Sequence, residues 1–230
     1  HFHNVYLGVW TDKAVRPQYE NITGQFFYRG FWFDQIYDLG KFEGLHAWTY
    51  YSESAHVLNW TQANCIEITL LRVDGLWMDR IFTFAVKTAV HVVTSTYGGT
   101  SRVIYLNGLY ADFTERAIHI EATAPAHMFV GSVFHLGQVW NVSPAEALPL
   151  ACTVDITAGI NHNIQIASMY SVLCATNAVN LAGSNNQVWI GSCVAEQYSR
   201  ASTGHGAFTA AATNIIHAGS GSSLNPWPGG

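Results

Sequence analysis

Aromatic side chains are the residues of this chain best suited to recognition chemistry. Eight tryptophans occur among 230 residues, and an aromatic-dense region lies within the first eighty positions. Exposed rings stack on the apolar faces of sugars and lose little conformational entropy on binding. A single ring of this kind is more often part of a core, so the hypothesis concerns the group. We expect a glycan-binding surface drawn from Trp32, Tyr37, Trp48, Tyr50, Tyr51, Trp60 and Trp77.

Two histidines among the first three residues could hold a metal ion. If His1 is the mature amino terminus, its amine and imidazole could chelate copper together with His3. A third histidine would complete the copper brace of secreted lytic polysaccharide monooxygenases. No segment around His119, His127 or His135 resembles the second-histidine motif of that class. A copper-dependent polysaccharide monooxygenase is therefore an alternative function.

Carboxylates give a second enzymatic alternative, a glycoside hydrolase, which needs two of them on either side of the scissile bond. Asp34 and Asp38 would share a face only on a helix, and no strand carries alternating acidic residues. Turn carboxylates could also ligate calcium, although the sequence has no dense acidic loop. There is no nucleophile elbow, phosphate loop or dinucleotide motif. We predict no enzymatic activity, no catalytic residue and no cofactor, with calcium left possible.

Cysteines and glycosylation motifs bear on the compartment. The four cysteines are widely spaced and form no C-x-x-C pair, which argues against a zinc ribbon or a thioredoxin-like site. They allow two disulfides, with buried free thiols as the alternative. Acceptor tripeptides begin at Asn21 and Asn59 and slightly favour a secreted protein. The cysteines in question are Cys65, Cys152, Cys174 and Cys193.

Charge and hydropathy exclude several classes of protein. Only 11% of the residues are charged and the formal net charge is −5. Nucleic-acid binding through phosphate neutralisation needs clustered Lys and Arg, so we exclude it. Disorder needs low hydrophobicity with high net charge, which is the reverse of this composition. The long uncharged stretches are broken by polar residues, so we expect no membrane span.

The composition changes near residue 150. Residues 1–150 hold 22 of the 25 charged side chains, and residues 151–230 are rich in small residues and end in a Gly/Ser/Pro-rich tail. We therefore place a domain boundary there, with a β-sandwich in 1–150 and a β-rich, charge-poor extension in 151–230. A protein surface with so few charged side chains would promote non-specific association. Covering it with neighbouring subunits would remove that problem.

Short β-branched or aromatic runs predict strands at 65–70, 81–86 and 90–94. Turn dipeptides separate them, at Asp74-Gly75, Gly98-Gly99 and Asn107-Gly108. This spacing indicates an all-β antiparallel sandwich. One helical turn is expected at 143–148. For 178–192 a hairpin turning at 184–186 is the simplest interpretation, and a stacked β-solenoid is the alternative.

Three segments within residues 65–150 resemble the laminin-G-like jelly roll of the concanavalin A-type lectin and glucanase superfamily. Residues 82–99 are similar to the strand leading into "HVAVTYDG", 103–110 to the "LYVNG" hairpin, and 139–148 to the "WNRALSPAEI" turn. Gly98 stands where that family has an aspartate. The motifs are turns of the scaffold and carry no site residue. The resemblance implies a jelly roll that binds glycans or proteins, in some relatives with calcium.

These observations together predict a non-catalytic recognition or structural module that binds glycan or protein. We expect it to self-associate as a subunit of a filament, fibre or shell. We expect it to be extracellular, secreted, or on the surface of a virion or particle.

Overall fold

The computed structural model describes the whole chain except residues 50–51, 100, 143–144, 199–205, 221 and 227–230. In this described part of the chain, all sixteen strands belong to one sheet, and every pairing between them is parallel. The predicted antiparallel jelly-roll sandwich, and with it the resemblance to laminin-G-like domains, is therefore wrong. The strands are β1 (Phe2–Val15), β2 (Gln18–Tyr37), β3 (Gly40–Ala47), β4 (Ile66–Leu70), β5 (Asp74–Phe84), β6 (Thr88–Val92), β7 (Val103–Asp112), β8 (Arg116–Ile120), β9 (His127–Leu136), β10 (Cys152–Ile156), β11 (Asn163–Val172), β12 (Val179–Leu181), β13 (Gln187–Tyr198), β14 (Phe208–Ala210), β15 (Ile215–Ala218) and β16 (Ser223–Pro226).

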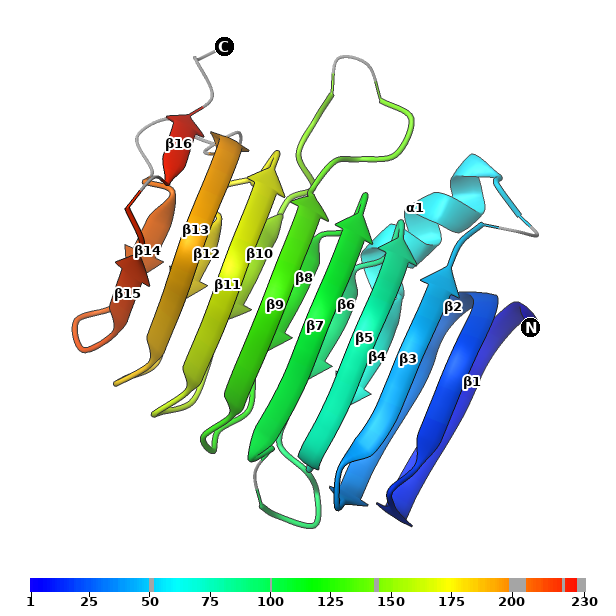
Figure 1. Cartoon of the computed structure of the whole chain (residues 1–230). Helices are drawn as coiled ribbons and strands as arrows, with labels where there is room; N and C mark the ends of the chain where they lie inside the picture. Colours follow the sequence, from blue (N-terminus) through cyan, green and yellow to red (C-terminus); the bar gives the residue numbers. More distant parts are fainter. Residues whose placement is uncertain (50–51, 100, 143–144, 199–205, 221, 227–230) are drawn as a thin grey trace.

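The sheet folds over at β2 into two layers (Figure 1). The first part of β2 pairs with β3, and its second part pairs with β4. Apart from the pairing of β3 with β2, from β3 onward odd-numbered strands pair with odd-numbered ones and even-numbered with even-numbered, except that β16 pairs with β13. We call the layer β3-β5-β7-β9-β11-β13-β15 the long wing and the layer β4-β6-β8-β10-β12-β14 the short wing. The chain thus winds as a solenoid, with one long and one short strand in each coil.

All-parallel sheets usually occur in α/β proteins, because a helix makes the crossover between parallel neighbours. Here a strand of the opposite wing makes it. The described residues contain one helix, α1 (Ala55–Asn64), between β3 and β4. Its N-cap is Ser54, whose Oγ accepts a hydrogen bond from the Val57 amide at 3.3 Å. The sequence does not predict this helix, because its apolar residues do not recur on one face at helical spacing.

The core lies between the wings, and the long strands share one pattern that builds it. Inward-facing apolar residues flank two consecutive outward-facing residues, as in Leu106 and Leu109 around Asn107 and Gly108. Two successive outward residues break the period of two, so the strand bends around the core. The same pattern recurs at 78–81, 130–133, 166–169 and 190–193.

Short strands supply the other half of the core. Val90, Ile118 and Val154 are fully buried and occupy one register across β6, β8 and β10. Burial of such side chains stabilises the fold by roughly 1.5–3 kcal/mol each. The wings also meet through polar groups: His135 Nδ1 of β9 lies 3.0 Å from Thr153 Oγ1 of β10.

Several local predictions need correction. Asn107-Gly108 is no hairpin turn but lies inside β7, where Gly108 pairs with Ser132. Residues 184–186 do connect two strands, but these belong to different wings, so the solenoid alternative describes this part of the chain. The helical turn expected at 143–148 falls partly outside the described residues, and its Ala147 forms a β-bridge with Gln138.

Strand locations were predicted better than their partners. β4, β5 and β6 cover most of the three runs expected as strands. Gly98 and Gly99 both have positive φ, as a turn there requires. Pairing across residue 150 is continuous, since β8 pairs with β10 and β9 with β11. The boundary near residue 150 is a change of composition along one series of coils, and a separate domain there stays a prediction.

All four cysteines are buried free thiols in the structure. This agrees with the alternative of buried free thiols and not with two disulfides. Burial raises the pKa of Cys193 to about 11, which keeps this thiol protonated and unreactive. Among the described residues, no helix has the length and apolar character needed to cross a membrane.

Candidate functional site

An aromatic ladder runs across the outer face of the long wing. Trp77, Tyr105 and Phe129 occupy one register on β5, β7 and β9. Their ring centroids are 5.2 and 5.5 Å apart in turn. Further along the same register Trp189 stacks on His217 at 3.6 Å. We call this row the first ladder; its rings present their edges to solvent.

A second ladder runs beside the first, five residues further along each strand. Phe82, Tyr110, Phe134 and Tyr170 occupy one register on β5, β7, β9 and β11. Neighbouring ring centroids are 5.4, 4.2 and 5.4 Å apart. Stacking of this kind adds about 0.5–1.5 kcal/mol per pair to the burial of the rings. The ladders therefore form two rigid walls.

Small residues form the floor between the two ladders, at the outward positions where the long strands bend. The hollow beside the first ladder has a volume of about 610 Å³, and the one beside the second about 470 Å³. No Asp, Glu, Lys or Arg lines the larger hollow. A neutral ligand is therefore favoured there. The floor residues are Asn107, Gly108, Gly131, Ser132, Ala167, Ser168, Gly191 and Ser192.

The first ladder is interrupted at one rung. Gln165 pairs with Phe129 on one side and with Trp189 on the other, so an exposed amide stands where neighbouring rungs carry rings. Strands lie about 4.8 Å apart, which places the two flanking rings about 9–10 Å apart. A flat ring between them needs roughly 7–8 Å, two van der Waals separations of carbon. We call this break in the row of rings, where the Gln165 side chain stands, the Gln165 notch.

The notch and floor combine apolar faces with neutral hydrogen-bonding groups. The Gln165 amide can both donate and accept, and the floor serines each carry a hydroxyl. Within the described part of the chain, the hydroxyls of Ser132 and Ser192 each donate one long hydrogen bond, at 3.5 Å, to a main-chain carbonyl. Both hydroxyls can therefore form stronger hydrogen bonds with a ligand. This chemistry suits a molecule with a flat apolar face and hydroxyls at its rim.

The structure does not bring the predicted glycan-binding residues together. Trp77 lies in the first ladder and is 46% exposed. Trp60 is exposed on α1, whereas Trp48 packs against Phe84 at a centroid distance of 4.1 Å. Trp32 stacks on Trp10 at the far side of the molecule. Tyr37 lies under the Arg72 guanidinium, and Tyr50 and Tyr51 fall outside the described residues.

The predicted modification and metal residues are spread over the surface. Asn21 and Asn59 are both exposed, so glycosylation there stays a prediction. His1 Nδ1 contacts Thr23 Oγ1. No group of three ligand side chains in the described part of the chain includes His1 or His3. The copper site at the amino terminus stays an untested alternative.

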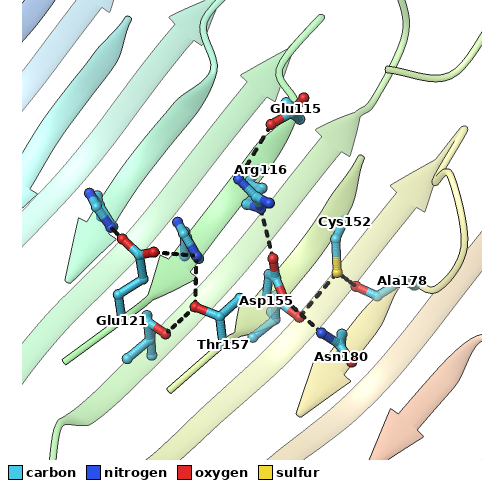
Figure 2. A network of polar contacts seen from close by, with 12 residues as sticks. Glu115, Arg116, Glu121, Cys152, Asp155, Thr157, Ala178 and Asn180 are labelled. Atoms are coloured by element: carbon cyan, nitrogen blue, oxygen red, sulfur yellow. Dashed lines mark hydrogen bonds and ion pairs between the residues drawn. The ribbon is translucent and has the colours of Figure 1, made fainter. Parts of the chain in front are cut away.

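A polar row runs across the outer face of the short wing (Figure 2). Its members alternate with core residues and occupy one register from β4 to β12. Arg116 Nε donates to Asp155 Oδ2 at 2.7 Å, and Asn180 Nδ2 donates to Asp155 Oδ1 at 2.8 Å. A second arginine nitrogen lies 3.3 Å from Glu115 Oε1. The row consists of Thr69, His91, His119, Asp155 and Asn180.

Two histidines at the centre of this row converge on one carboxylate. The rings of His91 and His119 lie parallel, 4.8 Å apart. His91 Nε2 is 2.6 Å from Glu121 Oε2, and His119 Nε2 is 3.9 Å from Glu121 Oε1. Burial lowers the pKa of both imidazoles; that of His119 falls to about 3, with the Arg116 charge contributing. Both rings are therefore neutral at neutral pH.

Glu67 of β4 is a buried acid in the short wing. Its side chain is almost fully buried, and its Oε1 has no hydrogen-bond partner among the described residues. Burial raises its pKa to about 8. The carboxyl is therefore neutral at neutral pH.

Comparisons with known proteins do not assign this chain to a family. No protein-family model matches it, and neither do any curated proteins or solved structures. The interpretation of its function rests on the site itself.

The sequence contains a repeat that could have predicted the groove. Pairs of small residues recur between apolar ones, and an aromatic residue precedes several of these pairs by two positions, as in Tyr105 before Asn107 and Phe129 before Gly131. Coils of unequal length hide this repeat. The residues it would have added are Tyr105, Phe129, Gln165, Trp189 and His217.

Proposed function

We propose that the chain is a non-catalytic carbohydrate-binding solenoid whose long-wing groove holds a neutral polysaccharide. The observation that carries this proposal is the Gln165 notch, where the faces of Phe129 and Trp189 are turned toward an amide. Sugar rings have an apolar face for such aromatic rings and equatorial hydroxyls for the amide. One ring in the notch would anchor a chain lying along the floor.

The dimensions and chemistry of the groove favour a chain over a compact ligand. It continues across β5, β7, β9, β11, β13 and β15 with hollows beside both ladders. No Asp, Glu, Lys or Arg lines its larger hollow, which disfavours acidic polysaccharides there, because their carboxylates or sulfates need basic partners. Arg80 lines the smaller hollow, where it pairs with Glu43 and Asp79. A neutral glycan fits better. Such a ligand also agrees with a place outside the cell or on a particle surface.

Binding without cleavage follows from the same lining. Glycoside hydrolysis needs two carboxyl groups close to the scissile bond, and none lines the hollow that contains the notch. The glycoside hydrolase alternative is therefore disfavoured at this site. The proposed role is attachment or recognition.

The test is retention on neutral polysaccharides, such as β-glucan, xylan and mannan, by affinity electrophoresis. We expect one of them to retain the chain and Trp189→Ala to weaken binding at least about tenfold. Trp60→Ala is the matched control, because Trp60 has similar exposure, 49% against 44%, but lies on α1. Equal loss in both variants, or no retention by any of these polymers, would contradict the proposal.

A second candidate function, assembly, is favoured by β1. Among the described residues this strand pairs only with β2, so one of its edges is open. It also exposes large apolar side chains, Trp10 at 70% and Leu7 at 61%. An open, apolar edge strand is a template for another strand. We propose that a second copy of the chain packs on this edge.

Light scattering at micromolar concentration tests the assembly. The chain should show a mass above 25.3 kDa, and Trp10→Lys should reduce it to that of one chain. Trp60→Lys, a like change on α1, should leave the mass unchanged. A wild-type mass of one chain would refute self-association through β1.

A further inference from the structure

We infer that the short wing carries a binding site for a zinc-class divalent ion, formed by His91, His119 and Glu121. The ligand atoms of these three side chains all lie within 4.8 Å of one another. The site is on the opposite wing from the glycan groove and does not depend on it. Among the described residues it is the one group of three or more such side chains that could hold an ion.

The solenoid register places the two imidazoles. His91 of β6 and His119 of β8 are paired residues on adjacent strands. Val90, Val92, Ile118 and Ile120 flank them and are buried in the core, which turns both histidines to the outer face. Their parallel rings direct both Nε2 atoms toward the same carboxylate, and the core holds both strands in place. Little ordering is then needed when an ion binds.

Glu121 completes the set from the end of β8. Its carboxylate oxygens lie 2.6 and 3.9 Å from the two Nε2 atoms. Two ligands at about 2.0–2.1 Å from a tetrahedral zinc are roughly 3.3 Å apart. These two distances lie on both sides of this value, and the widest separation in the set, at most 4.8 Å, would close by side-chain rotation as the ion binds. Glu121 is 47% exposed, which leaves the ion a path from solvent.

The surroundings favour a cation with imidazole affinity. Arg116 is nearby, but Asp155 and Glu115 pair with it and compensate its charge. Two imidazoles and one carboxylate suit Zn²⁺, Co²⁺ or Ni²⁺, whereas Ca²⁺ and Mg²⁺ prefer oxygen ligands alone. Three protein ligands leave a position for water. His119 Nε2 lies 3.1 Å from Thr157 Oγ1, and it would exchange this hydrogen bond for the ion.

Isothermal titration of the EDTA-treated, dialysed chain with zinc chloride tests the site. We expect one ion per chain at this site, and a loss of affinity of about 100-fold or more in Glu121→Gln and in His119→Ala. His56→Ala is the control, because His56 is exposed on α1. Circular dichroism confirms that each variant is folded; Glu121→Gln changes an exposed group and preserves its shape.

His3→Ala separates this site from any ion held at the amino terminus. The proposed site should survive this change and be lost in Glu121→Gln. Cobalt(II) gives a second readout, since four-coordinate binding produces visible absorption that Glu121→Gln should remove. If wild-type chain binds no zinc, or if zinc binding persists in Glu121→Gln and disappears in His3→Ala, the inference is overturned.

Discussion

The outer faces of the two wings are built by the same register but carry different chemistry. On the long wing, most coils from β7 onward add aromatic rings and small neutral residues, and the larger hollow is lined without Asp, Glu, Lys or Arg. On the short wing, the coils of β6, β8, β10 and β12 add an imidazole, a carboxylate or an amide, and most of these groups are buried and hydrogen-bonded to a neighbouring polar group. Stacked parallel strands thus repeat whatever residue type one position carries, apolar or ionisable.

The length of the strands explains the difference. A long strand bends at two consecutive outward positions, where small residues leave room for a groove between the ladders. A short strand of five residues has no such bend, so its few outward side chains pack side by side. We therefore assign binding of a polymer to the long wing and binding of ions to the short wing.

The largest expected difference between the wings is in pH response. The pKa of Glu67 is raised by burial, from 4.5 to about 8, so the folded chain binds a proton that the unfolded chain has lost between these values. The protonated Glu67 carboxyl therefore contributes stability that is fully present below pH 4.5 and is lost as pH rises through 8, by up to roughly 5 kcal/mol. Glu67→Gln should remove most of this loss in urea unfolding at pH 5 and pH 8.

Glu196→Gln on the long wing is the control for that experiment, because Glu196 accepts a hydrogen bond from exposed Tyr170. It should leave the pH dependence almost unchanged. A wild-type chain equally stable at both pH values would show that Glu67 is not held as a buried acid.

A smaller difference is expected between ion pairs on the two wings. Arg116 and Asp155 pair while both are about 90% buried or more, so Arg116→Met leaves a buried carboxylate uncompensated. We expect this to cost about 3 kcal/mol of unfolding free energy. Arg80 pairs with Glu43 and Asp79 on the long wing but is 60% exposed, so Arg80→Met should cost less than about 0.5 kcal/mol. Equal costs in chemical denaturation would remove the distinction between the wings.

Within the long wing, the floor glycines Gly108 and Gly131 differ in the space available for a side chain. A Cβ at Gly131 would lie 2.4 Å from the Asn107 carbonyl oxygen, whereas one at Gly108 meets nothing nearer than 3.9 Å. Gly131→Ala should therefore lower the unfolding free energy by about 2 kcal/mol. Gly108→Ala should change it by less than about 0.5 kcal/mol. The same cost for both, measured in urea, would mean that the floor is not closely packed.

Sequence alone predicted where several strands lie but not how they pair. The β-branched runs that became β4 and β6 are recognisable because the inward-facing residues of a short buried strand are apolar, as Ile68 and Val90 are. Parallel pairing depends on residues one coil away, and an Asn-Gly pair at 107–108 indicates a hairpin to any local rule. In the solenoid the same pair fills an outward bend of β7.

Most of the candidate site could not be predicted from the sequence either, because its residues become neighbours only through pairing between coils. His91 and His119 are distant in sequence and become neighbours only through register. The predicted aromatic group lay too near the amino terminus, because local density of rings was the available signal. Ladder residues such as Tyr105, Phe129 and Trp189 are spread one per coil, so only the repeat of small-residue pairs could have aligned them.

The Gln165 notch gives the most direct test of the central claim, that the long wing binds a neutral polysaccharide. Gln165→Trp would place a ring between Phe129 and Trp189 and continue the ladder without removing any aromatic side chain. Affinity for the retained polysaccharide, measured by isothermal titration, should fall at least about tenfold while thermal stability is kept. Unchanged or tighter binding by Gln165→Trp would contradict the notch as the anchoring site.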